Sequence, residues 1–476
     1  MSKSQSSIDI DPAEGALGPG PIGPGRVVKP ALLEMPLARQ VAVLAIWPFL
    51  EQLLNFMVGF VDTALAGRLS TQATNAIGVA AYIGWLMGLV QAAVGVGATA
   101  LISRAVGAGR SRRADRVLGQ AMLLAPLVGI AVGAGIYVLA PWIGSFVRLT
   151  GASLEALVTY LRILAMAVPM WAVLSIGSAC LRGAGDTRTP FVVLVVVNIV
   201  NVTVSLLLVA GPGPIGGHGI AGIAWGTFVA WIVGGAGFLI VLIRSGRPIQ
   251  LRRRMLRPTG SILWRILRLA GPNLAEGFLG MWLANFVLVR IVGLLGVDSA
   301  WAAHIVVVRI EAVSYMSGFA LGLAAATLAG QHLGSGRSDR ARQAVGACWL
   351  AGAGVMTFFG LIFILLPGPL VRLVTDEPAL LAASPPLLRL IGVVQFFFGS
   401  AIVLGHGMRG AGDTRGPLLL TAFSSYFVRL PLAWWFGLKL GWGLWGIWLA
   451  MSVELTVRGS IFIARYLRGR WLTVDV

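Results

Sequence analysis

Long apolar runs separated by short polar segments account for most of the sequence. A membrane-spanning helix takes roughly 20 residues, and most of these runs reach that length. The chain is therefore expected to be an all-α polytopic membrane protein. The pattern predicts twelve transmembrane helices, at roughly 40–66, 77–103, 118–140, 154–179, 190–210, 219–243, 263–295, 299–329, 343–366, 385–406, 417–437 and 443–466.

A seven-residue stretch, RGAGDTR, occurs twice. It spans Arg182–Arg188 and returns as Arg409–Arg415, 227 residues later. The stretches that begin at Gly107 and Gly334, GAGRS and GSGRS, keep the same offset. Several matches at one offset indicate an internal duplication. Because each copy holds an even number of helices, we expect two parallel six-helix repeats.

The repeats and the polar segments divide the chain into five parts. The first residues are rich in glycine and proline and are expected to be disordered. The predicted order is a cytoplasmic tail (1–39), an N-lobe with helices 1–6 (40–243), a basic cytoplasmic linker (244–262), a C-lobe with helices 7–12 (263–467) and a second cytoplasmic tail (468–476).

Basic residues gather in alternate loops, which predicts the orientation. One set of loops holds only Arg68, Arg148, Arg372 and Lys439. Basic loops stay in the cytoplasm, so the arginine-rich loops and both termini should lie there, in a bacterial inner membrane. The arginine-rich set comprises Arg104, Arg110, Arg112, Arg113, Arg116, Arg182, Arg188, Arg244, Arg247, Arg252, Arg253, Arg254, Arg257, Arg337, Arg340, Arg342, Arg409 and Arg415.

Composition excludes several classes of function. Charged residues make up 12% of the chain, against about a quarter in soluble domains. The net charge of +19 does not indicate nucleic-acid binding, because the arginines are spread over these loops. No Walker-type phosphate loop, HExxH, GxSxG or Cys/His cluster is present. We therefore expect neither an enzyme nor a bound cofactor.

Polar residues inside the predicted N-lobe helices are candidates for function. An ionisable group in hydrocarbon is costly and needs a partner or a purpose. Glu51, Asn55 and Asp62 lie on one stripe of the first helix and must face the interior or water. Asn198 and Asn201 lie on one face of the fifth helix. The two asparagines would complete a polar pocket with Asp62 or hold helices together.

The C-lobe carries different polar residues. Glu276 lies in the seventh helix, without a cation on the same helix within two turns. His304, Glu311 and Tyr315 form one stripe on the eighth helix. Glu454, by contrast, has Arg458 one turn further on and indicates an ion pair within a helix.

Several motifs together resemble the multidrug and toxic compound extrusion (MATE) family. The resemblance covers about residues 40 to 467. Its motifs occur in order and at the repeat spacing. They are Phe60–Gly67, Gly107–Arg110, both copies of RGAGDTR, Gly271-Pro272, Ala302–His304 and Gly330–Gly336.

The resemblance implies two six-helix lobes that form a V and expose a central cavity to one side at a time. It implies export of organic, often cationic compounds in exchange for Na⁺ or H⁺. Asp62 matches the family's first-helix aspartate, and Asn201 an asparagine of the same ion or proton site. Ser205 replaces a frequent aspartate, and the tenth helix lacks one. The sequence therefore leaves open which lobe holds the coupling ion.

These observations combine into one hypothesis of mechanism. Burial raises the pKa of a carboxyl group and makes it a usable proton carrier. Asp62, with Glu276 or Glu311 as a second site, would bind and release the proton or a Na⁺ ion. The expected partners are organic cations and the lipid bilayer, for a monomer without an ATPase. Candidate residues of the substrate cavity are Glu51, Asn55, Tyr315 and His304.

Two other functions remain as alternatives. One is a flippase for lipid-linked oligosaccharides from the same wider superfamily, which the helix count and the interior carboxylates disfavour. The other is a membrane receptor or scaffold without transport, which would gain little from two equal halves. The sequence does not choose between Na⁺ and H⁺, nor does it name the physiological substrate.

Overall fold

The computed structural model describes residues 31–212, 215–244, 248–296 and 298–474, apart from a few side chains within this part. All regular secondary structure in the described residues is helical. The proposed N-terminal tail lies mostly outside this part. The first half contains α2 (Ala31–Glu34), α3 (Leu37–Leu69), α4 (Thr71–Gly107), α5 (Ser111–Phe146), α6 (Gly151–Gly183), α7 (Arg188–Ala210), α8 (Gly219–Ile243) and the 3₁₀ turn η2 (Arg253–Leu256).

The second half repeats this order with more interruptions. It contains α9 (Gly260–Ala275), η3 (Glu276–Leu283), α10 (Ala284–Gly293), α11 (Asp298–Gly334), α12 (Ser338–Leu365), α13 (Pro367–Arg372), α14 (Pro378–Val393), α15 (Gln395–Gly410), α16 (Arg415–Phe423), η4 (Ser424–Arg429), α17 (Leu430–Trp434), η5 (Trp435–Lys439), α18 (Gly443–Arg468) and η6 (Arg470–Thr473). The segments η3, η4 and η5 are π-helical.

The helices agree with the twelve predicted spans. In the described residues, ten helices are long and apolar enough to cross a membrane, with α9, η3 and α10 forming one of them. The pair α14 and α15, bent by 56°, makes an eleventh. The twelfth is Arg415–Lys439, where α and π turns alternate. The predicted all-α fold of two six-helix repeats is therefore confirmed, and most helices extend a few residues beyond their predicted ends.

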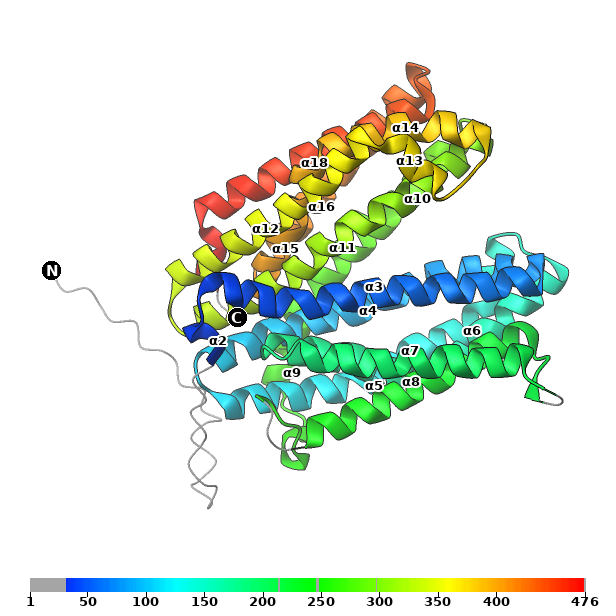
Figure 1. Cartoon of the computed structure of the whole chain (residues 1–476). Coiled ribbons are helices and arrows are strands. Elements are labelled where there is room, and N and C mark those ends of the chain that lie inside the picture. The colour runs from blue at the N-terminus through cyan, green and yellow to red at the C-terminus, as the bar shows by residue number, and fades with distance from the viewer. Residues whose placement is uncertain (1–30, 213–214, 245–247, 297, 475–476) are drawn as a thin grey trace.

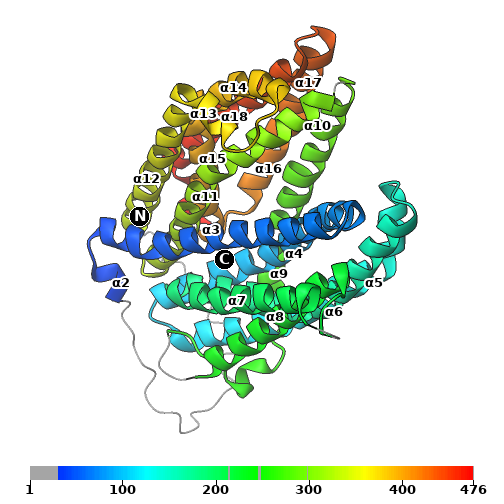
Figure 2. The same cartoon turned by 45° about the vertical axis from the view of Figure 1, so that its right-hand side comes forward.

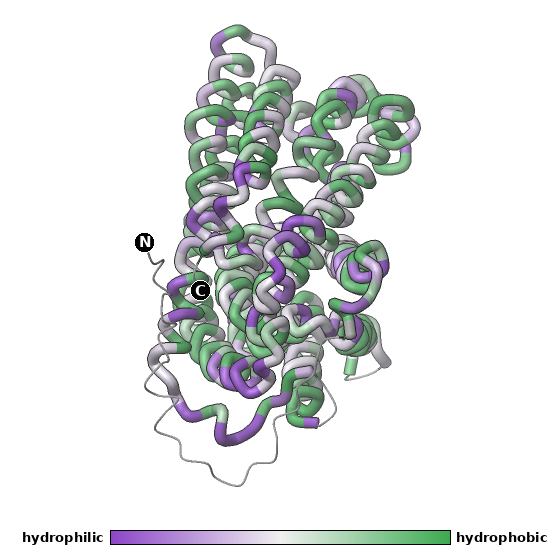
Figure 3. Tube along the Cα trace, turned by 90° about the vertical axis from the view of Figure 1, so that its left-hand side faces the viewer, coloured by the Kyte–Doolittle hydropathy of each residue, from purple (hydrophilic) through white to green (hydrophobic). Residues whose placement is uncertain are grey.

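The two repeats form the arms of a V (Figures 1 and 2). The helices α3–α8 form one arm, and α10–α18 form most of the other. The arms meet where both described ends of the chain lie and separate towards the opposite end. We call these the closed end and the open end. Hydrophilic stretches gather on the loops of the closed end, while the helices behind them are largely hydrophobic (Figure 3).

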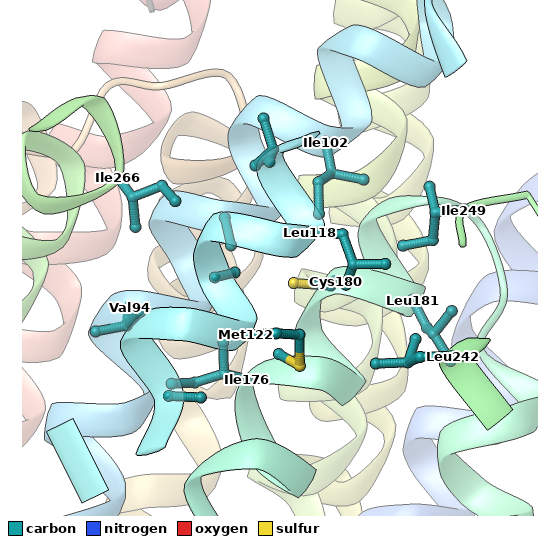
Figure 4. Close-up of a cluster of buried hydrophobic side chains, with 14 of the residues drawn as sticks. Val94, Ile102, Leu118, Met122, Ile176, Cys180, Leu181, Leu242, Ile249 and Ile266 are labelled. Carbon is teal, nitrogen blue, oxygen red and sulfur yellow. The ribbon is translucent and has the colours of Figure 1, made fainter. Parts of the chain in front are cut away.

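The first helix of each repeat packs against the other arm at the closed end. Val41 and Leu44 of α3 are buried in a cluster with Leu321 and Leu328 of α11. In the opposite sense, Ile266 of α9 joins the buried core of the N-terminal arm. Figure 4 shows this side chain at the edge of the same cluster as Val94, Ile102 and Leu118. Apolar contacts therefore tie the arms together at this end.

The helices α4 and α11 cross at the closed end without intervening side chains. A Cβ atom on Gly107 would overlap the carbonyl oxygen of Gln331, and one on Gly334 would overlap that of Arg104. These two contacts are related by the 227-residue offset of the repeat. Gly330 and Ser103, which also match at this offset, face each other between them. The crossing therefore has the two-fold symmetry of the duplication.

Hydrogen bonds reinforce the crossing and end on the repeated loops. The Arg104 guanidinium of α4 donates to the carbonyl oxygens of Ala411, at 2.7 Å, and Val474, at 2.8 Å. In the opposite direction, the Gln331 amide of α11 donates to the Gly183 carbonyl at 3.1 Å. Each RGAGDTR segment thus accepts a hydrogen bond from the second helix of the other repeat.

The described residues of the linker lie against the N-terminal arm. Asp115 of α5 accepts a hydrogen bond from the Gln250 amide at 2.8 Å. Gln120, one helical turn and a half further on, donates to the carbonyl of Met255 and accepts from the Thr259 amide. These bonds satisfy backbone groups of a segment that has little regular structure of its own.

Candidate functional site

The repeated RGAGDTR segments form tight turns between helices. Gly185 and Gly412 adopt φ angles of +94° and +99°, which favour glycine. The carboxylates of Asp186 and Asp413 accept hydrogen bonds at 3.0 Å from backbone amides in the first turn of the next helix. This is how an aspartate caps a helix N-terminus.

The first arginine of each repeated segment binds a glutamate of the first helix in its own repeat. Arg182 Nη1 lies 3.0 Å from Glu51 Oε1. Arg409 Nη1 lies 2.9 Å from Glu276 Oε1, which also accepts a hydrogen bond from Thr421 at 3.0 Å. The side chains of both pairs are less than one fifth exposed. The arginines therefore neutralise two of the predicted carboxylates, a role that the sequence analysis did not foresee.

The remaining polar residues of the first helix lie towards the open end. Asn55 is exposed, as a residue of a water-filled cavity would be. Asp62 lies on α3 two turns further along, but its side chain is outside the described residues. Its predicted role in ion or proton binding therefore stays a prediction.

Asn198 and Asn201 lie buried where α7 meets α8. The Asn201 amide donates to the Thr227 hydroxyl at 2.9 Å, while its carbonyl oxygen Oδ1 has no partner in the described residues. The same holds for Asn198 Nδ2 and for the hydroxyl of Ser205, one turn further on. Gly226 of α8 lets the two helices approach closely here, since a Cβ atom at this position would overlap the Ser205 hydroxyl of α7. Unpaired oxygens in a buried site suit a hard cation or a water molecule.

The stripe on α11 passes from buried to exposed positions. His304 is 8% exposed and packs between Trp301 and Trp448, and its Nδ1 has no hydrogen-bond partner in the described residues. Glu311 is also 8% exposed and forms no ion pair or hydrogen bond within that part of the chain. Tyr315, one turn beyond Glu311, is 39% exposed. Glu311 is therefore a buried carboxyl group close to an accessible tyrosine.

A second buried charge cluster lies nearby in the C-terminal arm. Glu454, fully buried, binds Arg458 at 3.1 Å, which confirms the predicted pair. It also binds Arg429 of η4 at 2.7 Å. Arg429 in turn donates to the Asn285 side chain at 3.1 Å. Arg429 was missed although it stands alone as a cation within the span 417–437, a signal comparable to that of Glu276.

The N-terminal arm contains a neutral pair at the corresponding place. The repeat offset relates Glu454 to Thr227 and places Arg429 within one residue of the equivalent of Asn201. The C-terminal arm thus has an ion pair where the N-terminal arm has the Asn201–Thr227 hydrogen bond. Among the described residues, no group of three His, Cys, Asp or Glu side chains is arranged to hold a metal ion.

Two parallel, pseudo-symmetric six-helix arms with ionisable groups buried inside them define a multi-pass membrane protein of the two-lobed kind. The chain belongs to the MatE family. The family model matches residues 49–207 and 274–435, one segment in each arm.

Curated relatives match over most of their length. The chain is 28% identical over 421 residues to a probable multidrug resistance protein NorM of Thermotoga maritima, which covers 88% of this chain and 90% of the relative. It is 26% identical over 443 residues to the multidrug resistance protein PmpM of Pseudomonas aeruginosa, with coverage of 90% and 91%.

Solved structures support the fold. A crystal structure of MATE in the straight conformation matches with a TM-score of 0.86 at 18% identity, covering 93% of this chain and 98% of that one. A transporter of the MOP superfamily from Pyrococcus furiosus matches with a TM-score of 0.85, also at 18% identity and with the same coverage.

Proposed function

We propose that this protein is a secondary active antiporter that exports organic, often cationic compounds in exchange for H⁺ or Na⁺. Membership of the MatE family supports transport, and the relatives named as multidrug resistance proteins support efflux. The sequence offers no Walker-type motif for ATP, so an ion gradient would supply the energy.

The orientation proposed from the loops gives the V a direction. With the arginine-rich loops and both termini in the cytoplasm, the closed end faces the cytoplasm. The space between the arms then opens to the outside. Alternating access requires the arms to separate at the closed end and to meet at the open end. Transport couples to an ion only if the ion and the substrate favour opposite states or compete for one state.

Glu311 is the proposed proton carrier of the C-terminal arm. The coupling proposal rests on the observation that this carboxyl group is buried and forms no ion pair with a described residue. Glu51 and Glu276 form ion pairs with arginines, whereas Glu311 forms no ion pair with a described residue and interacts with Arg429 only through the longer-range charge. A buried carboxylate without a direct ion pair is costly, so the group favours a bound proton or cation. The exposed Tyr315 lies one turn away, towards the accessible surface.

The N-terminal arm offers a second proposed site. Asp62 together with Asn201 would bind Na⁺ or a proton, with Asn198 one turn from Asn201 on α7. The unpaired Oδ1 of Asn201 supports a cation there, since amide oxygens are suitable ligands for hard cations. Glu51, Asn55, Tyr315 and His304 remain the proposed residues of the substrate cavity.

The proposal is tested with purified protein in proteoliposomes that contain a fluorescent organic cation. A proton gradient and a sodium gradient are imposed in separate experiments. We expect one of them to drive movement of the cation, and the effective gradient identifies the coupling ion. Absence of movement under both gradients, with folded protein, would contradict the antiporter proposal.

Replacement of Glu311 by Gln tests the coupling residue. The variant keeps the shape of the side chain but cannot release a proton, so we expect proton-driven export to fall at least tenfold. Binding of the fluorescent cation, measured by fluorescence anisotropy, should remain detectable. Glu155→Gln, at an exposed carboxylate near a helix start, is the matched control and should transport normally. Unchanged proton-driven export in Glu311→Gln would exclude Glu311.

A further inference from the structure

A cavity lined by arginines lies at the closed end on the flank of the C-terminal arm. It has a volume of about 340 Å³ and lies between α16 and α18. Its apolar wall is formed by Leu420, Ile461 and Ala464, and its basic wall by Arg465, Arg468 and Arg470. None of the residues that line it is acidic. The carboxylates of Glu276, Glu311 and Glu454 do not line it.

The basic wall is held in place by its surroundings. Gly469, with a φ angle of +71°, ends α18 and lets the chain turn into η6. Trp471 is fully buried directly after this turn, so the neighbouring Arg470 is anchored at the mouth of the cavity. Arg465 is oriented by Asp413, whose Oδ2 accepts a hydrogen bond from Arg465 Nη2 at 2.6 Å.

Two of the three guanidinium groups are available to a ligand. Arg468 and Arg470 are exposed, and neither side chain forms an ion pair or hydrogen bond with a described residue. Arg465 shares its charge with Asp413 but is still 30% exposed. The cavity therefore presents a net positive charge beside an apolar wall, which suits an amphipathic anion.

The surrounding surface identifies the source of that anion. Leu419 and Phe423 of α16 are 67% and 50% exposed, and Leu467 of α18 is 56% exposed. Large apolar side chains exposed on membrane-spanning helices face lipid, so the cavity borders the lipid phase. Arginines at the end of the span place it at the level of the headgroups. A small water-soluble anion would make no favourable contact with the apolar wall.

We propose that this cavity binds an anionic phospholipid from the membrane leaflet at the closed end. The phosphate would interact with Arg465, Arg468 and Arg470, and the first part of an acyl chain would pack on Leu420 and Ile461. Guanidinium groups bind phosphate in bidentate geometry, which adds directional strength to the charge attraction. Because Arg465 also binds Asp413, the lipid would stabilise the second RGAGDTR turn.

Native mass spectrometry of the detergent-purified protein tests the site by titration with phosphatidylglycerol and, separately, phosphatidylcholine. We expect one phosphatidylglycerol to bind more tightly than phosphatidylcholine. Arg468→Gln/Arg470→Gln should weaken its binding about 30-fold, since each of the two arginines contributes about 1 kcal/mol near a membrane surface and about 1.4 kcal/mol corresponds to a tenfold change in affinity. The control Arg337→Gln/Arg340→Gln removes equal charge from exposed positions at the same end and should leave binding unchanged.

Three outcomes would overturn the proposal. Equal retention of the two lipids by the unmodified protein would exclude an anionic site. Equal losses of phosphatidylglycerol affinity in both double variants would show that the overall charge of this end, and not the cavity, attracts the lipid. Displacement of the lipid by millimolar inorganic phosphate would show that the apolar wall contributes nothing. If the first double variant is not recovered as folded protein, Arg470→Gln alone is compared with Arg340→Gln.

Discussion

At the scale of single residues, two of the glutamates in the arms are paired with arginines that come from distant helices. The glutamates Glu51 and Glu276 each meet an arginine at the end of another helix of the same repeat. Removing one partner of such a pair leaves the other charge buried and unpaired, which costs more than the pair itself contributes.

We therefore expect Arg409→Ala to destabilise the protein by about 3 kcal/mol, because it leaves the carboxylate of Glu276 without its counter-ion. The measurement is thermal unfolding in detergent. Arg415→Ala removes an exposed arginine of the same loop and serves as the matched control. The double variant Arg409→Ala/Glu276→Gln should recover part of the loss. Equal melting temperatures for Arg409→Ala and the control would contradict this role.

The sequence predicted the buried acids better than their partners. A carboxylate within an apolar run is conspicuous, so Glu276, Glu311 and Glu454 were identified from the pattern alone. The pairing of Glu454 with Arg458 was also predictable, since both lie on one helix face. The partners Arg182 and Arg409 were assigned only to the arginine-rich loops. Their contacts depend on how distant helices pack, which periodicity along one helix does not encode.

At the scale of helices, the crossing of α4 and α11 depends on glycine. Gly107 and Gly334 bring each helix end against a backbone carbonyl of the other. A methyl group in such a position forces the backbones apart, and overpacking of this kind typically costs about 1–3 kcal/mol.

Gly107→Ala is therefore expected to lower the melting temperature of the purified protein and to reduce its free energy of unfolding by about 1–3 kcal/mol. Gly84→Ala is the matched control on the same helix, because no atom lies within 4 Å of the position of its Cβ. The control should be neutral or slightly stabilising, since alanine favours helix more than glycine does. A Gly107→Ala protein as stable as the control would show that the crossing adapts without cost.

The order of the helices was predictable, whereas their irregularities were not. Apolar length alone predicts spans, and it located all twelve. The π-helical turns η3, η4 and η5 leave no mark in such a pattern. The 56° bend between α14 and α15 falls at Val394, although the prolines Pro385 and Pro386 lie within α14. A pattern of apolar lengths does not encode such features.

At the scale of the whole molecule, the closed end must open if the protein works by alternating access. Gln40 of α3 and His332 of α11 lie on opposite arms there, with Gln40 Oε1 3.1 Å from His332 Nε2. A covalent link between these positions would hold the arms together and block the second state of the cycle.

We expect the variant Gln40→Cys/His332→Cys to lose transport on oxidation and to regain it on reduction. The two native cysteines, Cys180 and Cys348, are buried and should not interfere. Uptake of the fluorescent cation into proteoliposomes, before and after reductant, measures the effect, and each single variant is its control. Full transport by the protein with the disulfide formed would argue against separation of the arms at this end.

The symmetric crossing of α4 and α11 also has a consequence for the origin of the protein. Gly107 contacts Gln331 while Gly334 contacts Arg104, so the two-fold relation between the duplicated halves converts each contact into the other. Such reciprocity is the property of an isologous dimer interface, where one patch binds its own copy. A single six-helix ancestor could therefore have assembled as a homodimer through this surface. Gene fusion would then have made an existing partnership permanent and allowed the two halves to diverge, as the ion pair of Glu454 and the neutral pair of Thr227 now do.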